Sequence, residues 1–389
     1  MPWSPPPGQE WYYSLPSPSS THSVLSQLLH SPPHGDPTWG RDALPRAPEE
    51  QDVRERYGCR DGKVFLGKEG EKKEWVSYQV WEPKKDVESK EADLIWCHGI
   101  NDFGGKFSVH ATTFLDAGYR VIVPDLPGHG RSTGIHVYLP SMEALADAVY
   151  SVLRDVLLRD SELLAENEGR AQGGVHVTQK RKVFVAGQSL GGFTAVYTCL
   201  KYGTPPSTSL PRTAGHDTSH SFHPTITGGL FLCPMLAISP ESRPAYAVEL
   251  AARGLIKLGA GPLGFAEANK GKNTEDPEVE EQFDLDPQTY HGKLRIATGL
   301  SILAGLEDVN SKMEHLKIPF LLCHGTGDRV TSPLGSQTLY QRASTPAADK
   351  EIKLYEGYEH ILLRKGRDEK DDERRQNVLR DMKAWLERH

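Results

Sequence analysis

Short apolar runs that alternate with amphipathic helical segments constrain the fold of this chain more than any other feature. The runs lie at residues 93–97, 119–124, 182–186, 318–323 and 351–355. Each has the length of a strand and the continuous apolar character that burial on both faces of a sheet requires. Strands that alternate with helices in this way form a mostly parallel sheet. We therefore predict an α/β protein whose central sheet is flanked by helices.

Two more strands and two helices complete this predicted core. Residues 63–66 and 75–81 should open the sheet as an antiparallel pair, because apolar and polar side chains alternate along the second run. Ser141 is placed to cap a long helix. Val378, Met382, Trp385 and Leu386 follow helical spacing and predict a closing helix.

Residues 239–311 interrupt the alternation, since strand signals vanish there and helical spacing takes over. A stretch of this length between two core strands is too long for a loop. We predict a helical cap over 239–311, inserted between a first part of the core at 51–238 and a second part at 312–389. Two polar stretches, 166–179 and 204–224, are expected to be surface insertions.

Residues 1–50 contain 11 of the 28 prolines and lack sustained apolar periodicity. This composition predicts a disordered, proline-rich tail that either links or binds proline-recognising domains. The segment has neither the cationic start and apolar stretch of a secretory signal nor the arginine-rich character of a transit peptide. The expected location is therefore the cytoplasm.

Charge and cysteine content narrow the class of protein further. The net charge of −7 provides no basic surface for a phosphate backbone, which argues against nucleic acid as a partner. The five cysteines are widely spaced and form no CxxC pair, so we expect buried thiols in a reducing compartment. No apolar run reaches the length of about 18 residues that suggests a membrane helix.

The strongest local motif is GQSLG at residues 187–191, which follows a predicted strand and precedes a predicted helix. This context is typical of a nucleophile elbow, a sharp turn that raises the hydroxyl of Ser189 above the sheet. Gly187 and Gly191 fit such a turn because a Cβ atom at either position would collide. The alternative is that Ser189 only caps the helix.

A serine hydroxyl needs a histidine base and an acid that orients the histidine. In this architecture the residues follow in the order Ser, Asp, His, which excludes His98, His110 and His129 as the base. Candidates downstream are Asp328, after the strand at 318–323, and His360, after the last strand. Either could be an ordinary loop residue. Rival acids, Asp284, Asp286 and Asp308, lie in the predicted cap rather than at a strand end.

Acyl transfer also requires two backbone donors for the developing oxyanion. The amide of Leu190 directly follows the candidate nucleophile, where such a donor is expected. The second donor should come from the loop after the strand at 93–97, where Gly99 allows a turn and the amide of Ile100 can face the site. The alternative is a plain turn at the end of the strand.

Other motifs fit their templates poorly. Gly128, Gly130 and Gly134 follow a strand, but their spacing departs from the dinucleotide-binding pattern by one residue. The segment 99–106 approaches a phosphate-binding loop, yet Phe107 stands where Ser or Thr is required. No spacing of histidines and carboxylates suggests a metal site, and no cofactor is implied.

Six short motifs together resemble the monoacylglycerol lipase branch of the α/β-hydrolase superfamily. They are HGI and FGG at 98–105, DLPGHGRS at 125–132, GQSLGG at 187–192, HGTGDRVTSP at 324–333 and YEGYEH at 355–360. The resemblance covers residues 62–388. It implies Ser189 as nucleophile, Asp328 as acid, His360 as base, and the amides of Ile100 and Leu190 as the oxyanion hole.

The resemblance implies a lipid monoester as substrate and water as the second reactant. The same motifs occur in lysophospholipases, other carboxylesterases and serine peptidases, and a hydrolase fold can also serve as a non-catalytic binding protein.

The segment 245–265 is apolar over more than one packing stripe. Either both of its faces are buried, or part of it rests peripherally on a membrane, micelle or lipid droplet.

Overall fold

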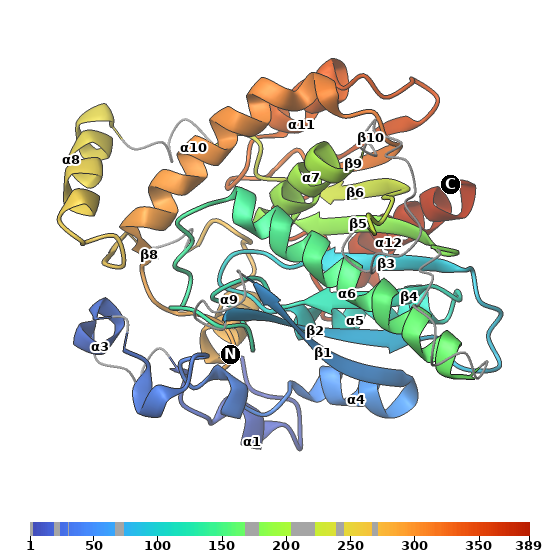
Figure 1. Cartoon of the computed structure of the whole chain (residues 1–389), viewed down its shortest axis with the longest axis horizontal. Helices are drawn as coiled ribbons and strands as arrows, with labels where there is room; N and C mark the ends of the chain where they lie inside the picture. Colours follow the sequence, from blue (N-terminus) through green and yellow to red (C-terminus); the bar gives the residue numbers. More distant parts are fainter. Residues whose placement is uncertain are drawn as a thin grey trace, which may run out of the picture.

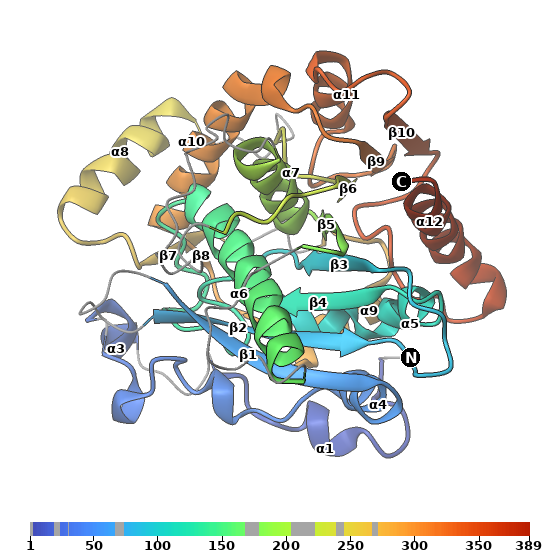
Figure 2. The same ribbon diagram turned by 45° about the vertical axis from the view of Figure 1, so that its right-hand side comes forward.

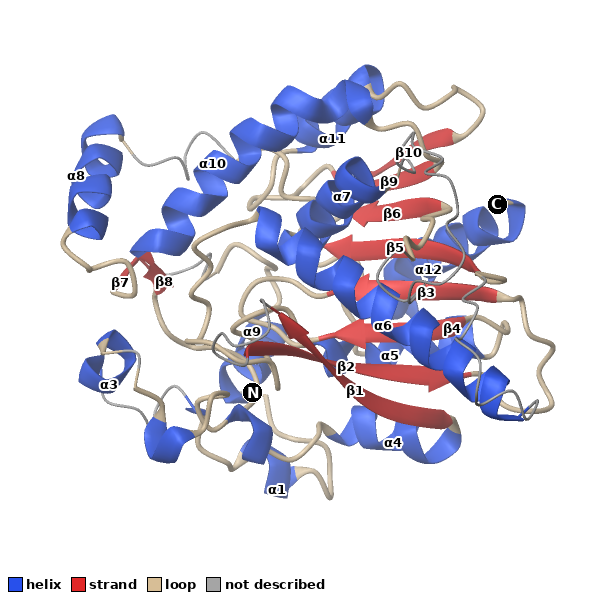
Figure 3. Ribbon diagram, in the orientation of Figure 1, coloured by secondary structure: helices blue, strands red, loops and turns tan. Residues whose placement is uncertain are grey.

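A computed structural model describes residues 3–18, 24–29, 31–66, 74–167, 179–203, 222–238, 245–266 and 271–389. Its centre is an eight-stranded sheet with the strand order β1-β2-β4-β3-β5-β6-β9-β10 (Figure 3). Strand β2 pairs antiparallel with both β1 and β4, and all other neighbours are parallel. This arrangement confirms the predicted α/β class with its antiparallel opening pair.

The strands have the following bounds: β1 Gly58–Leu66, β2 Glu74–Glu82, β3 Ala92–Cys97, β4 Arg120–Pro124, β5 Lys182–Gln188, β6 Gly228–Leu232, β9 Phe320–Gly325 and β10 Lys350–Tyr355. Every residue of β3, β4 and β6 is buried, as expected of strands covered on both faces. Strand β6 was not predicted from the sequence, because its glycine-rich apolar run carries no period that separates a strand from other buried segments.

Helices cover both faces of the sheet (Figures 1 and 2). The long helices α6 (Glu143–Asn167) and α7 (Leu190–Tyr202) pack on one face, together with α11 (Pro333–Arg342). The other face is covered by α5 (Ser108–Leu115) and α12 (Glu369–Arg388), the closing helix that the sequence predicts. The Ser141 hydroxyl accepts a hydrogen bond from the amide of Ala144, as predicted for a cap at the start of α6.

The segment between β6 and β9 forms the cap. It contains helices α8 (Tyr246–Lys257), α9 (Pro277–Leu285) and α10 (Ile296–Lys312), and a small antiparallel pair, β7 (Gly264–Ala266) with β8 (Leu294–Arg295). Val309 near the end of α10 is part of the hydrophobic core, so this helix also packs against the core. Helix α8 lies at the periphery beside α10 in both views (Figures 1 and 2).

The prediction of a disordered tail over residues 1–50 is wrong for the residues that the structure describes. They form α1 (Glu10–Tyr13), α3 (Val24–Leu28), the 3-10 turns η1 (Pro33–Gly35) and η2 (Arg41–Ala43), and the start of α4 (Pro48–Arg56). Tyr12 is fully buried and Trp39 is 3% exposed. Composition favoured disorder, but a few aromatic side chains bury enough surface to hold the segment against the core and the cap.

The structure agrees with two further predictions only in part, or covers only part of the residues concerned. Most of the expected surface insertions, residues 168–178 and 204–221, lie outside the described residues. All five cysteines are free thiols, four of them buried and Cys59 half-buried.

Among the helices in the described ranges, none has the length and apolar character needed to cross a bilayer.

Candidate functional site

The turn between β5 and α7 holds Ser189 in a conformation that side chains rarely adopt, with φ 59° and ψ −120°. Strand β3 lies directly beside β5, and a Cβ atom at Gly191 would approach the carbonyl oxygen of Cys97 to 2.0 Å. A Cβ atom at Gly187 would lie 2.4 Å from the carbonyl oxygen of Gly191. Only glycine fits at these two positions, and the resulting sharp turn agrees with the predicted nucleophile elbow.

The loops after β9 and β10 bring Asp328 and His360 together. His360 Nδ1 lies 2.7 Å from Asp328 Oδ2, and both side chains are almost fully buried. On the neighbouring elbow, Gln188 Nε2 donates to the backbone carbonyl of His360 at 3.1 Å. Because β5, β6, β9 and β10 are consecutive in the sheet, the candidate nucleophile, acid and base all follow the carboxyl ends of parallel strands.

Hydrogen bonds keep the Asp328 carboxylate ionised. Its Oδ1 accepts from the amides of Val330 and Thr331, and its Oδ2 accepts from the Thr331 hydroxyl at 2.8 Å. Burial by itself would raise the pKa of Asp328, but hydrogen bonds from the rings of His324 and His360 hold it well below the usual value. The carboxylate can thus orient the His360 ring and stabilise its protonated form.

A second histidine that contacts the candidate acid was not predicted from the sequence. His324 is fully buried, and its Nε2 lies 3.2 Å from Asp328 Oδ2. Its Nδ1 is 2.8 Å from the hydroxyl of Ser336. The sequence signal is the histidine that opens the HGTGD motif, but only the fold shows that it faces the carboxylate.

The rival acids are engaged elsewhere. Asp286 accepts hydrogen bonds from the Tyr12 hydroxyl and the amide of Gln288. Asp308 accepts from Tyr197 and from Lys312. Asp284 is exposed at the end of α9. Asp328 is the candidate acid that contacts His360.

Two backbone amides near the elbow belong to the candidate oxyanion hole: Leu190 at the start of α7 and Ile100 in the loop after β3. Within the described residues, no hydrogen bond has the N–H of Ile100 or of Leu190 as its donor. Ile100 follows β3, whose carboxyl end adjoins the elbow: a Cβ atom at Gly99 would lie 3.8 Å from the Cβ atom of Ser189. Two free amides in this position could stabilise an oxyanion.

Two buried histidines hold the loop that carries Ile100. His98 Nε2 accepts from the amide of Leu126 at 2.9 Å, and its Nδ1 lies 2.8 Å from the carbonyl of Gly99. His129 Nε2 accepts from the amide of Asn101 at 3.3 Å. Burial lowers the pKa of both His98 and His129, so both rings stay neutral. We excluded them as bases, and the structure gives them a role in positioning this loop.

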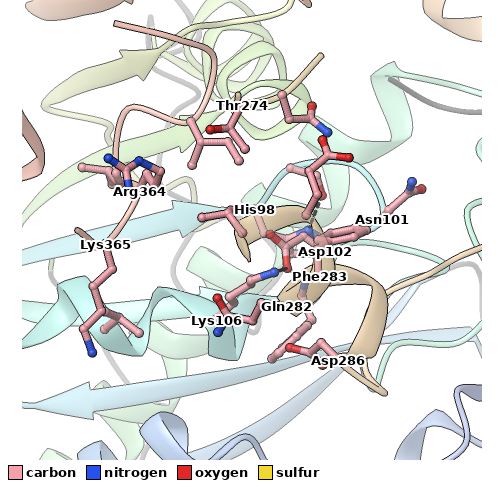
Figure 4. A pocket seen from close by; sticks show the side chains of 18 of the residues that line it. His98, Asn101, Asp102, Lys106, Thr274, Gln282, Phe283, Asp286, Arg364 and Lys365 are labelled. Carbon is pink, nitrogen blue, oxygen red and sulfur yellow. Dashed lines mark hydrogen bonds and ion pairs between the residues drawn. The ribbon is translucent and has the colours of Figure 1, made fainter. Parts of the chain in front are cut away.

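These loops open into a cavity of about 800 Å³. Its lining includes Ser189, His360 and Ile100. Figure 4 shows three of the parts of the chain that line it: the loop after β3 provides His98, Asn101 and Lys106, the cap provides Gln282 and Phe283, and the segment after His360 provides Arg364 and Lys365. The cavity has space for an ester with a sizeable acyl group.

One cluster in the described residues has the composition of a metal site. Ligand atoms of Cys233, Asp328 and His360 lie within 4.8 Å of one another. However, Asp328 and His360 already form a hydrogen bond. Burial raises the pKa of the Cys233 thiol well above its usual value, whereas metal ions bind the thiolate. The cluster is better explained by the hydrogen bond between Asp328 and His360, beside which the protonated Cys233 thiol lies.

Comparison with known proteins agrees with this geometry. The profile of the hydrolase family described as "Serine aminopeptidase, S33" matches residues 88–209 and 215–366. The chain is 30% identical over 293 residues to caffeoylshikimate esterase of Arabidopsis thaliana, covering 75% of this chain and 76% of that protein. It is 24% identical over 293 residues to human monoglyceride lipase, covering 74% and 80%.

A solved structure shows the same fold. The monoacylglycerol lipase of Paleococcus ferrophilus superposes with a TM-score of 0.57 at 22% identity, over 77% of this chain and 95% of that one. These matches confirm the resemblance drawn from the sequence motifs. The chain therefore belongs to the serine aminopeptidase S33 family of hydrolases and has the α/β-hydrolase fold.

Proposed function

We propose that this protein is a serine hydrolase that cleaves carboxylic esters, with monoacylglycerols or related single-chain lipid esters as its substrates. The observation that carries the proposal is the buried Asp328–His360 pair, whose histidine lines one cavity together with Ser189 in its elbow. The lipase and esterase names among the relatives support the ester bond as the target.

In the proposed mechanism, Ser189 Oγ attacks the ester carbonyl while His360 accepts its proton. The amides of Ile100 and Leu190 stabilise the oxyanion of the tetrahedral intermediate. His360 then protonates the departing alcohol, which leaves an acyl-enzyme on Ser189. Water, activated by the same histidine, releases the acid and restores the serine. Asp328 remains ionised throughout and stabilises the imidazolium.

Two other activities remain as alternatives within the same chemistry. Lysophospholipids or general carboxylic esters would use the same residues with a different leaving group. The relative that is 30% identical over 293 residues is named a caffeoylshikimate esterase, and aromatic side chains such as Trp96 and Phe107 line the cavity here. These observations favour an aromatic acyl ester as the second candidate substrate.

The first experiment separates a hydrolase from a non-catalytic binding protein. A fluorophosphonate probe should label the wild-type chain and should not label Ser189→Ala. The second experiment compares kcat/KM on glycerol monoesters, lysophospholipids, hydroxycinnamate esters, p-nitrophenyl esters and aminoacyl amides. Highest activity on a glycerol monoester supports the proposal. Absence of labelling, or activity on the amides alone, contradicts it.

We also propose that the cap contacts a lipid surface. No residue of α8 is buried, and its apolar side chains include Leu250 (59% exposed) and Leu255 (42% exposed). Leu258, directly after the helix, is 83% exposed. An apolar surface of this kind suits peripheral binding to a membrane or lipid droplet, where single-chain lipid esters reside. The five free thiols support a reducing compartment such as the cytoplasm.

A further inference from the structure

Part of the cavity wall belongs to a segment outside the family match. The matched region begins at residue 88. Nevertheless, Trp3, Pro6 and Tyr13 line the same cavity as Ser189 and His360. The family profile therefore does not account for this wall, and our sequence analysis placed these residues in a disordered tail.

Buried polar contacts fix the segment in place. The Tyr12 hydroxyl donates to Asp286 Oδ1 at 2.8 Å and accepts from Gln288 Nε2 at 3.0 Å. Gln288 Oε1 in turn accepts from Arg131, in the loop after β4, at 2.9 Å. The amide of Trp3 donates to Glu281 of α9 at 2.8 Å. The segment is thus held by the cap and, through Gln288, by the core.

Two aromatic side chains of this segment, Trp3 and Tyr13, pack against each other and line the cavity. The rings of Trp3 and Tyr13 meet edge to face, with centroids 4.8 Å apart. Both rings belong to a small apolar cluster with Phe103, which lies three residues after Ile100 in the sequence. The apolar surface of this cluster therefore continues from the loop of the candidate oxyanion hole to the N-terminal segment.

We propose that Trp3 and Tyr13 are specificity-determining residues that contact the apolar chain of the substrate ester, an inference that rests on the function proposed above. The faces of the aromatic rings in this wall remove methylene groups of the substrate from water. Each methylene buried against it raises kcat/KM by roughly fourfold. A short acyl group gains nothing from the wall because it does not extend to it.

The test uses two tryptophans of the same segment. Trp3 lines the cavity, whereas Trp11 does not line it and is 44% exposed. We expect Trp3→Ala to lower kcat/KM for p-nitrophenyl decanoate by roughly tenfold, equivalent to the loss of contact with about two methylenes. Hydrolysis of p-nitrophenyl acetate should stay within twofold. Trp11→Ala should change neither value, and Trp3→Phe should restore most of the activity on the decanoate.

Several results would overturn the inference. One is that Trp3→Ala behaves like Trp11→Ala on both esters. Another is that Trp3→Ala loses activity on both esters equally with a lowered Tm, which would assign Trp3 a structural role only. If Trp3→Ala does not fold, Trp3→Phe and Trp3→Leu provide the same comparison. These results can be distinguished from a failure of the proposed function, because the wild-type chain would then hydrolyse no ester and bind no fluorophosphonate.

Discussion

The hydroxyl of Tyr12 donates a hydrogen bond to the carboxylate of Asp286 at 2.8 Å, across 274 residues of sequence. Tyr12 is fully buried, and Asp286 lies directly after α9 in the cap. This contact joins the N-terminal segment to the element that covers the cavity. A segment that composition alone predicts to be disordered is therefore anchored to the cap by a buried hydrogen bond.

Removal of residues 1–18 should destabilise the protein. The truncation exposes the apolar surface that Tyr12 and Tyr13 cover and leaves Asp286 without its tyrosine partner. We expect Tm to fall by more than about 4 °C, a shift that corresponds to roughly 1 to 2 kcal/mol in a domain of this size. Thermal unfolding of the truncated and full chains measures this, with Trp11→Ala as the control. An unchanged Tm would show that this segment contributes little to stability, as expected of a disordered tail.

Replacement of Asp286 by Asn should stabilise the protein at alkaline pH. Burial raises the pKa of Asp286 from 3.8 to about 6. The folded chain therefore holds this proton more tightly than the unfolded chain does. The stability that results is complete below about pH 4 and is lost as the pH rises through 6. At pH 8 the loss in the wild type amounts to roughly 3 kcal/mol.

Denaturant unfolding at pH 5 and pH 8 measures this effect. The free energy of unfolding should fall more steeply between these pH values in the wild type than in Asp286→Asn. The matched control is Asp284→Asn, which alters an exposed carboxylate two residues away. Identical pH dependence in the wild type and Asp286→Asn would show that Asp286 does not titrate in this range.

Loss of the candidate nucleophile should abolish turnover without unfolding the chain. Ser189→Ala should lower kcat by about 10⁴ to 10⁶, as observed when one member of a cooperating triad is removed. The hydroxyl is small, so Tm should change little. Steady-state kinetics on a p-nitrophenyl ester tests this. A variant that keeps a tenth of wild-type turnover would reject Ser189 as the nucleophile.

An amide in place of the candidate acid should favour the wrong tautomer of His360. Asp328→Asn keeps the shape of the side chain but replaces one acceptor oxygen with an NH2 donor, so kcat should fall by about 10⁴. Asp308→Asn, a rival from the cap that bonds Tyr197 and Lys312, is the matched control. An active Asp328→Asn together with an inactive Asp308→Asn would reverse the assignment.

Polar substitutions on the exposed face of α8 should lower activity only on lipid substrates. Leu255→Ser combined with Ile256→Ser removes two apolar side chains that are 42% and 38% exposed. We expect weaker vesicle binding and slower hydrolysis of a long-chain monoacylglycerol, whereas p-nitrophenyl acetate should be unaffected. Co-sedimentation with phospholipid vesicles and kinetics on both esters measure this.

The control for this prediction lies on another helix. Leu163→Ser with Leu164→Ser alters two leucines of α6 that are 50% and 51% exposed. Helix α6 packs on the sheet rather than forming part of the cap (Figure 2). Equal loss of vesicle binding in both double variants would show a general effect of surface polarity and would exclude a docking face on α8.

The class of the fold, the positions of most strands and the candidate residues at their ends could be predicted from the sequence alone. Short apolar runs and a glycine-flanked serine are local patterns, and each can be interpreted without knowledge of distant residues. Strand β6 was missed, because a glycine-rich apolar run carries no period that assigns its conformation.

The contacts between residues distant in sequence could be known only from the folded chain. Nothing in the local pattern around Tyr12 indicates a partner at Asp286, and nothing around His324 shows that it faces Asp328. The physical reason is that such contacts depend on the order of strands in the sheet and on how the cap folds back over it. Neither leaves a periodic signal in the sequence, so the N-terminal wall of the cavity could be recognised only from the folded chain.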